Sequence, residues 1–176
     1  APSECIRRDA LREKPIGEKV IRGMYDQYIR PSIVAQDSSL PSCYIFDVDG
    51  TLAKMHNRSP FDWAKVGQDL INEPVAKICF QLKRLGHKII IMTGRDGIAL
   101  EDTKKWLRVS GIPYDEIYIR PEGNTENDGI IKRRMFEENV QGKYFVEGWF
   151  DDRDRVVAMI RDELNLPCFQ VNWGNF

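Results

Sequence analysis

The chain has 176 residues, of which 42% are apolar and 30% are charged. This length and composition exclude a disordered protein and predict one ordinary globular domain with a hydrophobic core. The formal net charge of −1 gives the chain as a whole no attraction to nucleic acid or to an anionic membrane, so any contact with a polyanion has to come from a local patch.

The cysteines and the apolar runs indicate where the protein works. The cysteines stand apart, with no CxxC spacing and no histidine cluster, which predicts reduced thiols and a cytoplasmic protein. No signal-peptide pattern is present, and no apolar run approaches the roughly 20 residues that a membrane-spanning helix needs. We therefore expect a soluble protein without membrane contact. The four cysteines are Cys5, Cys43, Cys79 and Cys168.

Residues 1–42 differ from the rest of the chain. Residues 1–30 carry many charges, and their apolar residues between Ile16 and Tyr28 are spaced as one stripe of an amphipathic helix. Residues 31–42 have the proline and serine content of a linker. A single amphipathic helix cannot form a core alone, and the segment begins without Met. We expect it either to dock on the following domain or to be the remnant of a kinase module removed upstream.

Residues 43–176 alternate between strand and helix patterns. The strands are too apolar to have a solvent face, which is typical of a parallel sheet covered by helices on both sides. We therefore predict an α/β fold, a doubly wound three-layer sandwich with a mainly parallel five-stranded sheet. In such sheets the ligand site lies at the carboxyl ends of the strands. The predicted strands are residues 43–48, 87–93, 116–120, 143–150 and 167–171, and the predicted helices are residues 72–86, 101–111, 126–140 and 153–164.

Chemically active side chains lie at the ends of three of these strands. Asp47 and Asp49 are two residues apart, and in an extended chain such residues point the same way, so their charges repel unless a cation relieves the repulsion. Carboxylates hold a hard divalent cation, whereas a hydroxyl and an ammonium hold an anion. The sequence therefore predicts a site for Mg²⁺ and a phosphate. The other groups of the site are Thr93, Gly94, Arg95, Asp151 and Asp152 at strand ends and Lys132 on a helix.

Four short motifs carry a resemblance to a known family. "DVDGT" at residues 47–51, "TGR" at 93–95, the helical Lys132 and "DD" at 151–152 resemble, in this order, the motifs of the haloacid-dehalogenase-type phosphotransferases. Longer stretches resemble the 3′-phosphatase domain of phage polynucleotide kinase, over nearly everything from Tyr44 to Phe176. They are "FDVDGTLAKMHNR", "MTGRD", "NDGIIKRRMF" and "FDDRDRVVAMIR". Part of residues 1–42 also resembles the end of the kinase module of that enzyme, although the chain has no GxxxxGK[ST] motif for kinase activity.

The resemblance implies a two-step mechanism through an aspartyl-phosphate. Asp47 would attack phosphorus, and Asp49 would protonate the departing sugar oxygen and then activate the water that hydrolyses the intermediate. Thr93 and Lys132 would hold the phosphoryl oxygens and stabilise the charge that spreads over them in the transition state.

The resemblance also implies Mg²⁺ as the cofactor. The carboxylate of Asp47, the main-chain carbonyl of Asp49 and the carboxylate of Asp152 would bind it, and Asp151 would hold one of its waters. The resemblance leaves open which of Asp151 and Asp152 touches the metal directly.

Three further residues match positions of the narrower family. The match implies that Arg58 and Arg95 lie on the substrate side and that Asp128 orients Lys132 or an arginine. A basic helix around Trp106 could face a strand of nucleic acid. Its cationic residues are Lys104, Lys105 and Arg108.

The favoured function is removal of a terminal 3′-phosphate, and in the resembled family also of a 2′,3′-cyclic phosphate, from RNA or DNA ends in nucleic-acid repair. The insert at residues 54–70 is too small for a closed cap domain, which leaves room for a polymer end. A small-molecule phosphatase of the same superfamily shares these catalytic residues and is an alternative. A receiver-like phospho-acceptor is the third hypothesis, but Asp49 argues against it. The resemblance places a phage-encoded protein in the host cell cytoplasm and is compatible with a homo-oligomer of the full-length protein.

Overall fold

The computed structural model describes residues 2–28 and 34–175. The chain forms two compact units, residues 1–33 and residues 34–176. Every residue predicted to take part in catalysis or metal binding lies in the second unit. The two units are described separately below.

The first unit contains two helices, α1 (Pro2–Asp9) and α2 (Glu18–Tyr28), where the sequence predicted one. The helix stops between them because Pro15 has no N–H to donate and Gly17 has a positive φ of 92°. The carboxylate of Asp9 accepts hydrogen bonds from two backbone N–H groups of this connection, at 3.2 and 2.9 Å. The prediction of a single helix is therefore wrong.

The linker predicted at residues 31–42 is only partly covered by the structure. Residues 31–33 lie outside the described residues, whereas Val34 is buried in the core of the second unit. The Gln36 side chain donates to the carbonyl oxygen of Val146 (3.1 Å) and accepts the N–H of the same residue (2.6 Å). These bonds satisfy backbone groups at the start of a strand, so the second unit includes residues expected in the linker.

The sheet of the second unit has five parallel strands in the order β5-β4-β1-β6-β7. The first strand in the sequence is therefore central, and the later strands are added outward on both of its sides, which confirms the doubly wound fold. The strands are β1 (Ser42–Phe46), β4 (Lys88–Asp96), β5 (Glu116–Arg120), β6 (Phe145–Asp151) and β7 (Cys168–Gln170).

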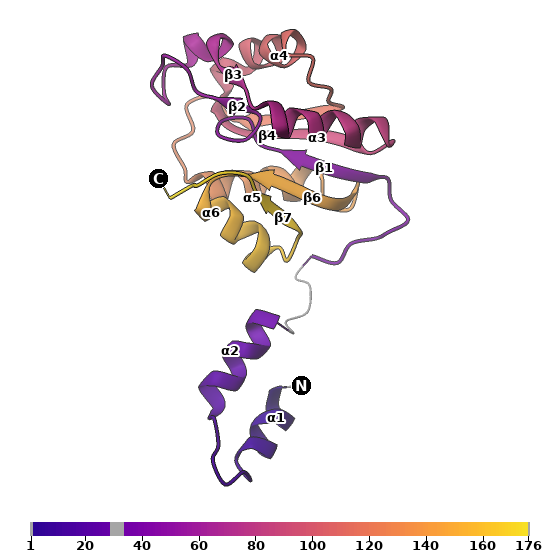
Figure 1. Cartoon of the computed structure of the whole chain (residues 1–176), viewed down its shortest axis with the longest axis vertical. Helices are drawn as coiled ribbons and strands as arrows, with labels where there is room; N and C mark the ends of the chain where they lie inside the picture. Colours follow the sequence, from indigo (N-terminus) through magenta and orange to yellow (C-terminus); the bar gives the residue numbers. More distant parts are fainter. Residues whose placement is uncertain (1, 29–33, 176) are drawn as a thin grey trace. The chain divides into compact units, whose positions relative to one another are not determined.

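Helices cover both faces of this sheet (Figure 1). Alternate residues of β4 point to opposite faces: Ile89 and Ile91 pack in one core cluster, and Ile90 and Met92 in the other. Burying each of these side chains contributes about 1.5–3 kcal/mol. The first cluster lies under α3 (Glu73–Arg84) and α4 (Leu100–Val109), and the second lies under α5 (Asp128–Asn139) and α6 (Asp154–Ala158), which a π-helical turn (Met159–Glu163) continues.

A short insert follows β1. It consists of the antiparallel pair β2 (Ala53–Lys54) and β3 (Leu70–Ile71), joined by a segment that contains the 3₁₀ helix η1 (Trp63–Gln68). The indole N–H of Trp106 on α4 donates to the carbonyl oxygen of Asp69 at 2.8 Å, which ties the insert to the helix layer. The insert is the minimal cap that the sequence predicted.

The topology places the ends of β1, β4 and β6 side by side, because β1 pairs with both of the others. The polar residues that follow these three strands therefore gather at one edge of the sheet. In the described part of the chain, no helix is long and apolar enough to cross a membrane.

Candidate active site

The turn after β1 sets the positions of the first two acidic residues. The N–H of Asp47 donates to the carbonyl oxygen of Phe150 on β6 (3.0 Å), so the chain stays attached to its neighbour up to this residue. The N–H of Gly50 then donates to the carbonyl oxygen of Ala53 (2.8 Å) and closes a tight turn. Asp49 lies in this turn and not in the strand. The expectation that its side chain lies beside that of Asp47 is therefore wrong.

Gly50 has no room for a side chain. Its φ is +82°, a conformation that residues with a Cβ rarely adopt. A Cβ at this position would lie only 2.0 Å from Oδ2 of Asp152. The glycine of the "DVDGT" motif therefore permits the turn and lets the loop after β6 approach the loop after β1.

Three carboxylates form a buried cluster at the carboxyl edge of the sheet. Oxygens of Asp47, Asp151 and Asp152 lie within 4.8 Å of one another. The ammonium of Lys132, on α5, contacts Oδ1 of Asp47 at 2.8 Å and Oδ2 of Asp151 at 2.7 Å. All four side chains are buried. Because three carboxylates face one ammonium, this acidic cluster carries an excess of negative charge.

The excess charge and the burial change the proton affinities of the cluster. Burial raises the pKa of Asp47 to about 7; Lys132 opposes this rise, whereas the neighbouring carboxylates of Asp151 and Asp152 add to it. Burial and the charge of Asp151 raise the pKa of Asp152 to about 6. Burial would lower the pKa of Lys132, but the charges of Asp151 and Asp47 outweigh it and raise that pKa. The lysine is therefore a fixed cation.

The acidic cluster fits a divalent cation. Carboxylate and carbonyl oxygens are the ligands that Mg²⁺ prefers, and the net negative charge needs a positive partner beyond Lys132. The side chains that could hold the ion are those of Asp47, Asp151 and Asp152. Asp49 is not part of this side-chain cluster, in keeping with the expectation that only its main-chain carbonyl would serve.

A second set of charges surrounds Asp49. Arg95 donates to both oxygens of Asp49, at 2.9 Å from Nε and 2.7 Å from a terminal nitrogen, and Arg58 donates to Oδ1 at 2.7 Å. Both arginines also contact Oδ2 of Asp69, in the insert, at 2.7 Å. The side chains of the two arginines and of Asp69 are sealed from solvent. This arginine network, Asp49, Asp69, Arg58 and Arg95, contains two carboxylates and two guanidinium groups.

The arginine network changes the roles expected of its members. Burial alone would raise the pKa of Asp49, but the hydrogen bonds and charges of Arg95 and Arg58 hold it below its usual range. The expectation that Arg58 and Arg95 face the substrate is wrong, because their guanidinium groups are engaged inside the domain and shielded from solvent. They hold Asp49 in place instead.

Thr93 and Asp128 lie on two further sides of the site. The buried hydroxyl of Thr93 accepts the N–H of Arg95 at 3.3 Å. Asp128, the first residue of α5, contacts Arg120 and Arg153 and makes no ion pair with Lys132. Of the two partners expected for Asp128, the arginine is therefore the observed one, although it is neither of the arginines singled out from the sequence.

Sequence reasoning missed Asp69, Arg120 and Arg153. Arg120 ends β5 and donates to the carbonyl oxygen of Gly94 at 2.8 Å, so the rule that ligand groups follow the strands could have found it. Asp69 precedes a short strand of the insert, and no spacing distinguishes it from a surface acid. Only its burial against two arginines identifies it.

Comparison with known proteins adds a family to this geometry. The model of the polynucleotide kinase PNKP phosphatase domain matches residues 41–176. A protein of Autographa californica nuclear polyhedrosis virus, described as a bifunctional polynucleotide kinase/RNA ligase, is 30% identical over 160 residues, which cover 87% of this chain and 23% of that protein.

Solved structures show the same relationship. A chain in a Pnkp1/Rnl/Hen1 complex is 43% identical with a TM-score of 0.81, over 85% of this chain and 52% of that chain. A chain in the Pnkp1/Rnl/Hen1 RNA repair complex is 37% identical with a TM-score of 0.79, over 99% and 62%. D,D-heptose 1,7-bisphosphate phosphatase from B. bronchiseptica, at 11% identity and a TM-score of 0.55 over 74% and 80%, shares the fold alone.

This chain thus spans about a quarter of its viral relative and just over half of the similar chains in the two repair complexes. The family match covers the whole sheet and every residue of the acidic cluster and of the arginine network. The sequence motifs, the doubly wound sheet and this match agree. The chain belongs to the family of polynucleotide kinase PNKP phosphatase domains.

Proposed function

We propose that the second unit is a Mg²⁺-dependent polynucleotide 3′-phosphatase, which removes the terminal 3′-phosphate or a 2′,3′-cyclic phosphate from RNA or DNA ends. The observation that carries the proposal is the buried cluster of Asp47, Asp151 and Asp152 around Lys132. In a phosphatase family, a carboxylate nucleophile beside a fixed cation and further oxygen ligands fits phosphoryl transfer.

In the proposed first step an oxygen of Asp47 attacks phosphorus, the bond to the sugar oxygen breaks, and an aspartyl-phosphate forms. Lys132, 2.8 Å from Asp47, is placed to stabilise the charge on the phosphoryl oxygens. The hydroxyl of Thr93 accepts a backbone N–H, which leaves its own O–H to donate to a phosphoryl oxygen. In the second step water attacks the aspartyl-phosphate and releases inorganic phosphate.

The proton transfers are assigned to Asp49. Its contacts with Arg58 and Arg95 favour the carboxylate form, which suits the acceptance of a proton from the attacking water. Donation of a proton to the departing sugar oxygen requires the protonated form. An approaching phosphate competes for the two guanidinium groups and so weakens their hold on the carboxylate.

The metal requirement follows from charge. A bound Mg²⁺ supplies positive charge that offsets the carboxylates and the substrate phosphate. Asp47, the main-chain carbonyl of Asp49, Asp151 and Asp152 would hold it. In its absence the carboxylates of the cluster repel one another and repel the phosphate.

The polymer substrate is supported by access to the site and by the relatives. The insert between β2 and β3 is short, and the similar chains come from structures described as Pnkp1/Rnl/Hen1 complexes, one of them an RNA repair complex. We propose that this chain works in a comparable RNA repair assembly. Residues 1–42 are then the end of an adjoining kinase module, and a homo-oligomer of a longer protein stays a prediction.

Phosphate release tests the proposal. Oligonucleotides with a 3′-phosphate, a 5′-phosphate or a cyclic end are compared with a 3′-mononucleotide in Mg²⁺ and in EDTA, with Asp47→Asn as the inactive control. We expect a preference for 3′-phosphate over 5′-phosphate of at least an order of magnitude, which is about 1.4 kcal/mol. Equal rates on both ends, or a preference for the mononucleotide, would move the assignment to the small-molecule phosphatase.

A further inference from the structure

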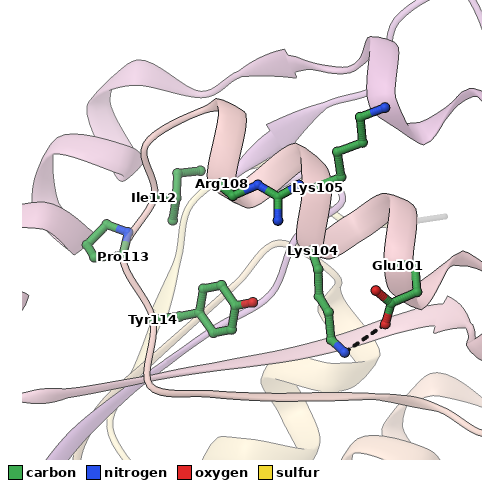
Figure 2. Close-up of a pocket in the computed structure, with 7 residues that line it drawn as sticks. All are labelled: Glu101, Lys104, Lys105, Arg108, Ile112, Pro113 and Tyr114. Atoms are coloured by element: carbon green, nitrogen blue, oxygen red, sulfur yellow. Dashed lines mark hydrogen bonds and ion pairs between the residues drawn. The ribbon is translucent and has the colours of Figure 1, made fainter.

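A basic groove lies beside α4, away from the residues of the acidic cluster (Figure 2). Its volume is about 440 Å³. Four of its residues recur at helical spacing on one face of α4, and the segment that leads into β5 forms the other wall. The lining residues are Glu101, Lys104, Lys105, Arg108, Ile112, Pro113 and Tyr114.

The charge of the groove differs from that of the chain. Three cations and one acid line it, whereas the whole chain has a net charge of −1. Lys104 bonds Glu101 at 2.8 Å, but Lys105 and Arg108 make no ion pair with any described residue. Their charges are therefore available to an anion, unlike the paired cations on the other side of the sheet, such as Arg133 and Arg134.

Tyr114 adds an aromatic surface to the groove. Its ring is partly buried and packs against the core cluster under α3 and α4, which holds it in position. In Figure 2 the ring lies between the strand wall and the side chains of Lys104 and Arg108. Cations beside a fixed aromatic ring are the combination that binds single-stranded nucleic acid, because phosphates meet the charges and a base stacks on the ring.

The opposite face of α4 holds the catalytic residues. Thr103 accepts a hydrogen bond from Arg95 at 3.2 Å, and Trp106 donates to the carbonyl oxygen of Asp69. Arg58 and Arg95 are engaged in the arginine network, so they are not available to the substrate strand. The phosphate contacts beyond the scissile group must therefore come from other cations, and α4 carries a row of them next to the site.

We infer that this groove binds the single strand that precedes the 3′-phosphate, with Lys105 and Arg108 on backbone phosphates and Tyr114 against a base. This inference rests on the proposed function, since it names the part of the substrate that lies outside the catalytic centre. Recognition by charge and stacking is independent of base sequence, as repair of arbitrary ends requires.

The test uses the whole chain and two matched pairs of substitutions. Lys105→Ala with Arg108→Ala removes two exposed cations from α4, and Lys77→Ala with Arg84→Ala removes two from α3 as the control. Binding of a fluorescent oligonucleotide with a 3′-hydroxyl is measured by anisotropy against salt. We expect the α4 pair to reduce the log–log salt slope by about 1.4, at 0.7 for each phosphate contact, and the control pair to leave it unchanged.

Catalysis supplies the second readout. We expect the α4 pair to raise KM for a 3′-phosphorylated oligonucleotide roughly tenfold and to leave hydrolysis of p-nitrophenyl phosphate unchanged. Tyr114→Leu, which keeps an apolar side chain against the core, should weaken oligonucleotide binding roughly fivefold or more. Thermal melting of each variant confirms that it is folded.

The outcomes separate the groove from the proposed function. If the wild type hydrolyses 3′-phosphorylated oligonucleotides and the α4 pair behaves as the control pair does, the groove is rejected and the function stands. If the wild type binds the 3′-hydroxyl oligonucleotide through the groove but hydrolyses only small esters, the proposed function is rejected. Competition by oligoglutamate as strong as that by an oligonucleotide of equal charge would overturn the assignment to nucleic acid.

Discussion

The acidic cluster and the arginine network are neighbouring sets of buried charges with opposite balances. The acidic cluster has three carboxylates and one ammonium, and the pKa values of Asp47 and Asp152 are raised. The arginine network has two carboxylates and two guanidinium groups, and the pKa of Asp49 is lowered. A balanced set of buried charges stabilises its own geometry, whereas an unbalanced set is completed only by a ligand. The acidic cluster is therefore the part built for a metal and a phosphate.

Removing one carboxylate from the acidic cluster separates catalysis from stability most clearly. Asp47→Asn should reduce phosphate release by about 10³-fold or more, because an amide cannot replace the nucleophile. In EDTA its unfolding free energy should not fall, because one of the repelling charges is gone while Lys132 keeps its contact with Asp151. Single-turnover assays and urea denaturation measure the two effects. Substantial turnover in a purified sample would remove Asp47 from the role of nucleophile.

The corresponding change in the arginine network should have the opposite pattern. Asp69→Asn leaves two buried guanidinium groups with Asp49 as their one carboxylate, so we expect a loss of about 3–5 kcal/mol in unfolding free energy. Chemical denaturation with and without Mg²⁺ checks this value. Glu101→Gln, at an exposed acid, is the control and should change stability by less than about 0.5 kcal/mol. A loss as small as that of the control would show that Asp69 does not organise the network.

Mg²⁺ should act on the acidic cluster alone. At a hundred times its Kd, an ion that binds only the folded state raises the unfolding free energy by about 2.7 kcal/mol. We expect this gain in the wild type, its near loss in Asp152→Asn, and its retention in a folded variant of the arginine network such as Arg58→Lys. Thermal melting in a Mg²⁺ titration reports all three. The same gain in Asp152→Asn would place the ion elsewhere.

The pH dependence in EDTA should have a different sign for each set. Asp47, with a pKa of about 7, and Asp152, with one of about 6, bind protons more tightly when folded, so their contribution is lost as the pH rises toward 7. Asp49 has a lowered pKa, so its contribution is present above its ordinary value of 3.8 and is lost as the pH falls through its folded pKa. We expect unfolding free energy to fall by about 1 kcal/mol or more from pH 5 to pH 8.

Denaturation at several pH values with chelator checks this profile, and the same series with Mg²⁺ is its control. The ion replaces the protons of the acidic cluster, so the decrease between pH 5 and pH 8 should become smaller when Mg²⁺ is present. A flat profile in EDTA would mean that the carboxylates of the cluster are not coupled to folding.

The sequence was sufficient for the fold and for the acidic cluster, because both follow from rules that act along the chain. Apolar runs of strand length gave the sheet, and the convergence of strand ends brought Asp47 to Asp151 and Asp152. Lys132 could be found because its motif lies in order with the others.

The arginine network could not be predicted in the same way. Whether Arg95 turns toward the substrate or toward the interior depends on the packing of the insert, and the sequence does not specify where Asp69 comes to lie. The two N-terminal helices show a related limit. A helical stripe ran on into residues where Pro15 and Gly17, together with the bonds to Asp9, end the first helix.

The contact between Gly50 and Asp152 limits how this protein can vary. Gly86 and Gly142 also have positive φ, but open space surrounds the position of a Cβ at both, so asparagine is a tolerable substitute there. At position 50 the space is already filled by Asp152, and a substitution displaces that carboxylate whatever its backbone preference. Selection for activity can therefore explore sequence at the other two turns, while position 50 can change only together with the loop that carries Asp152.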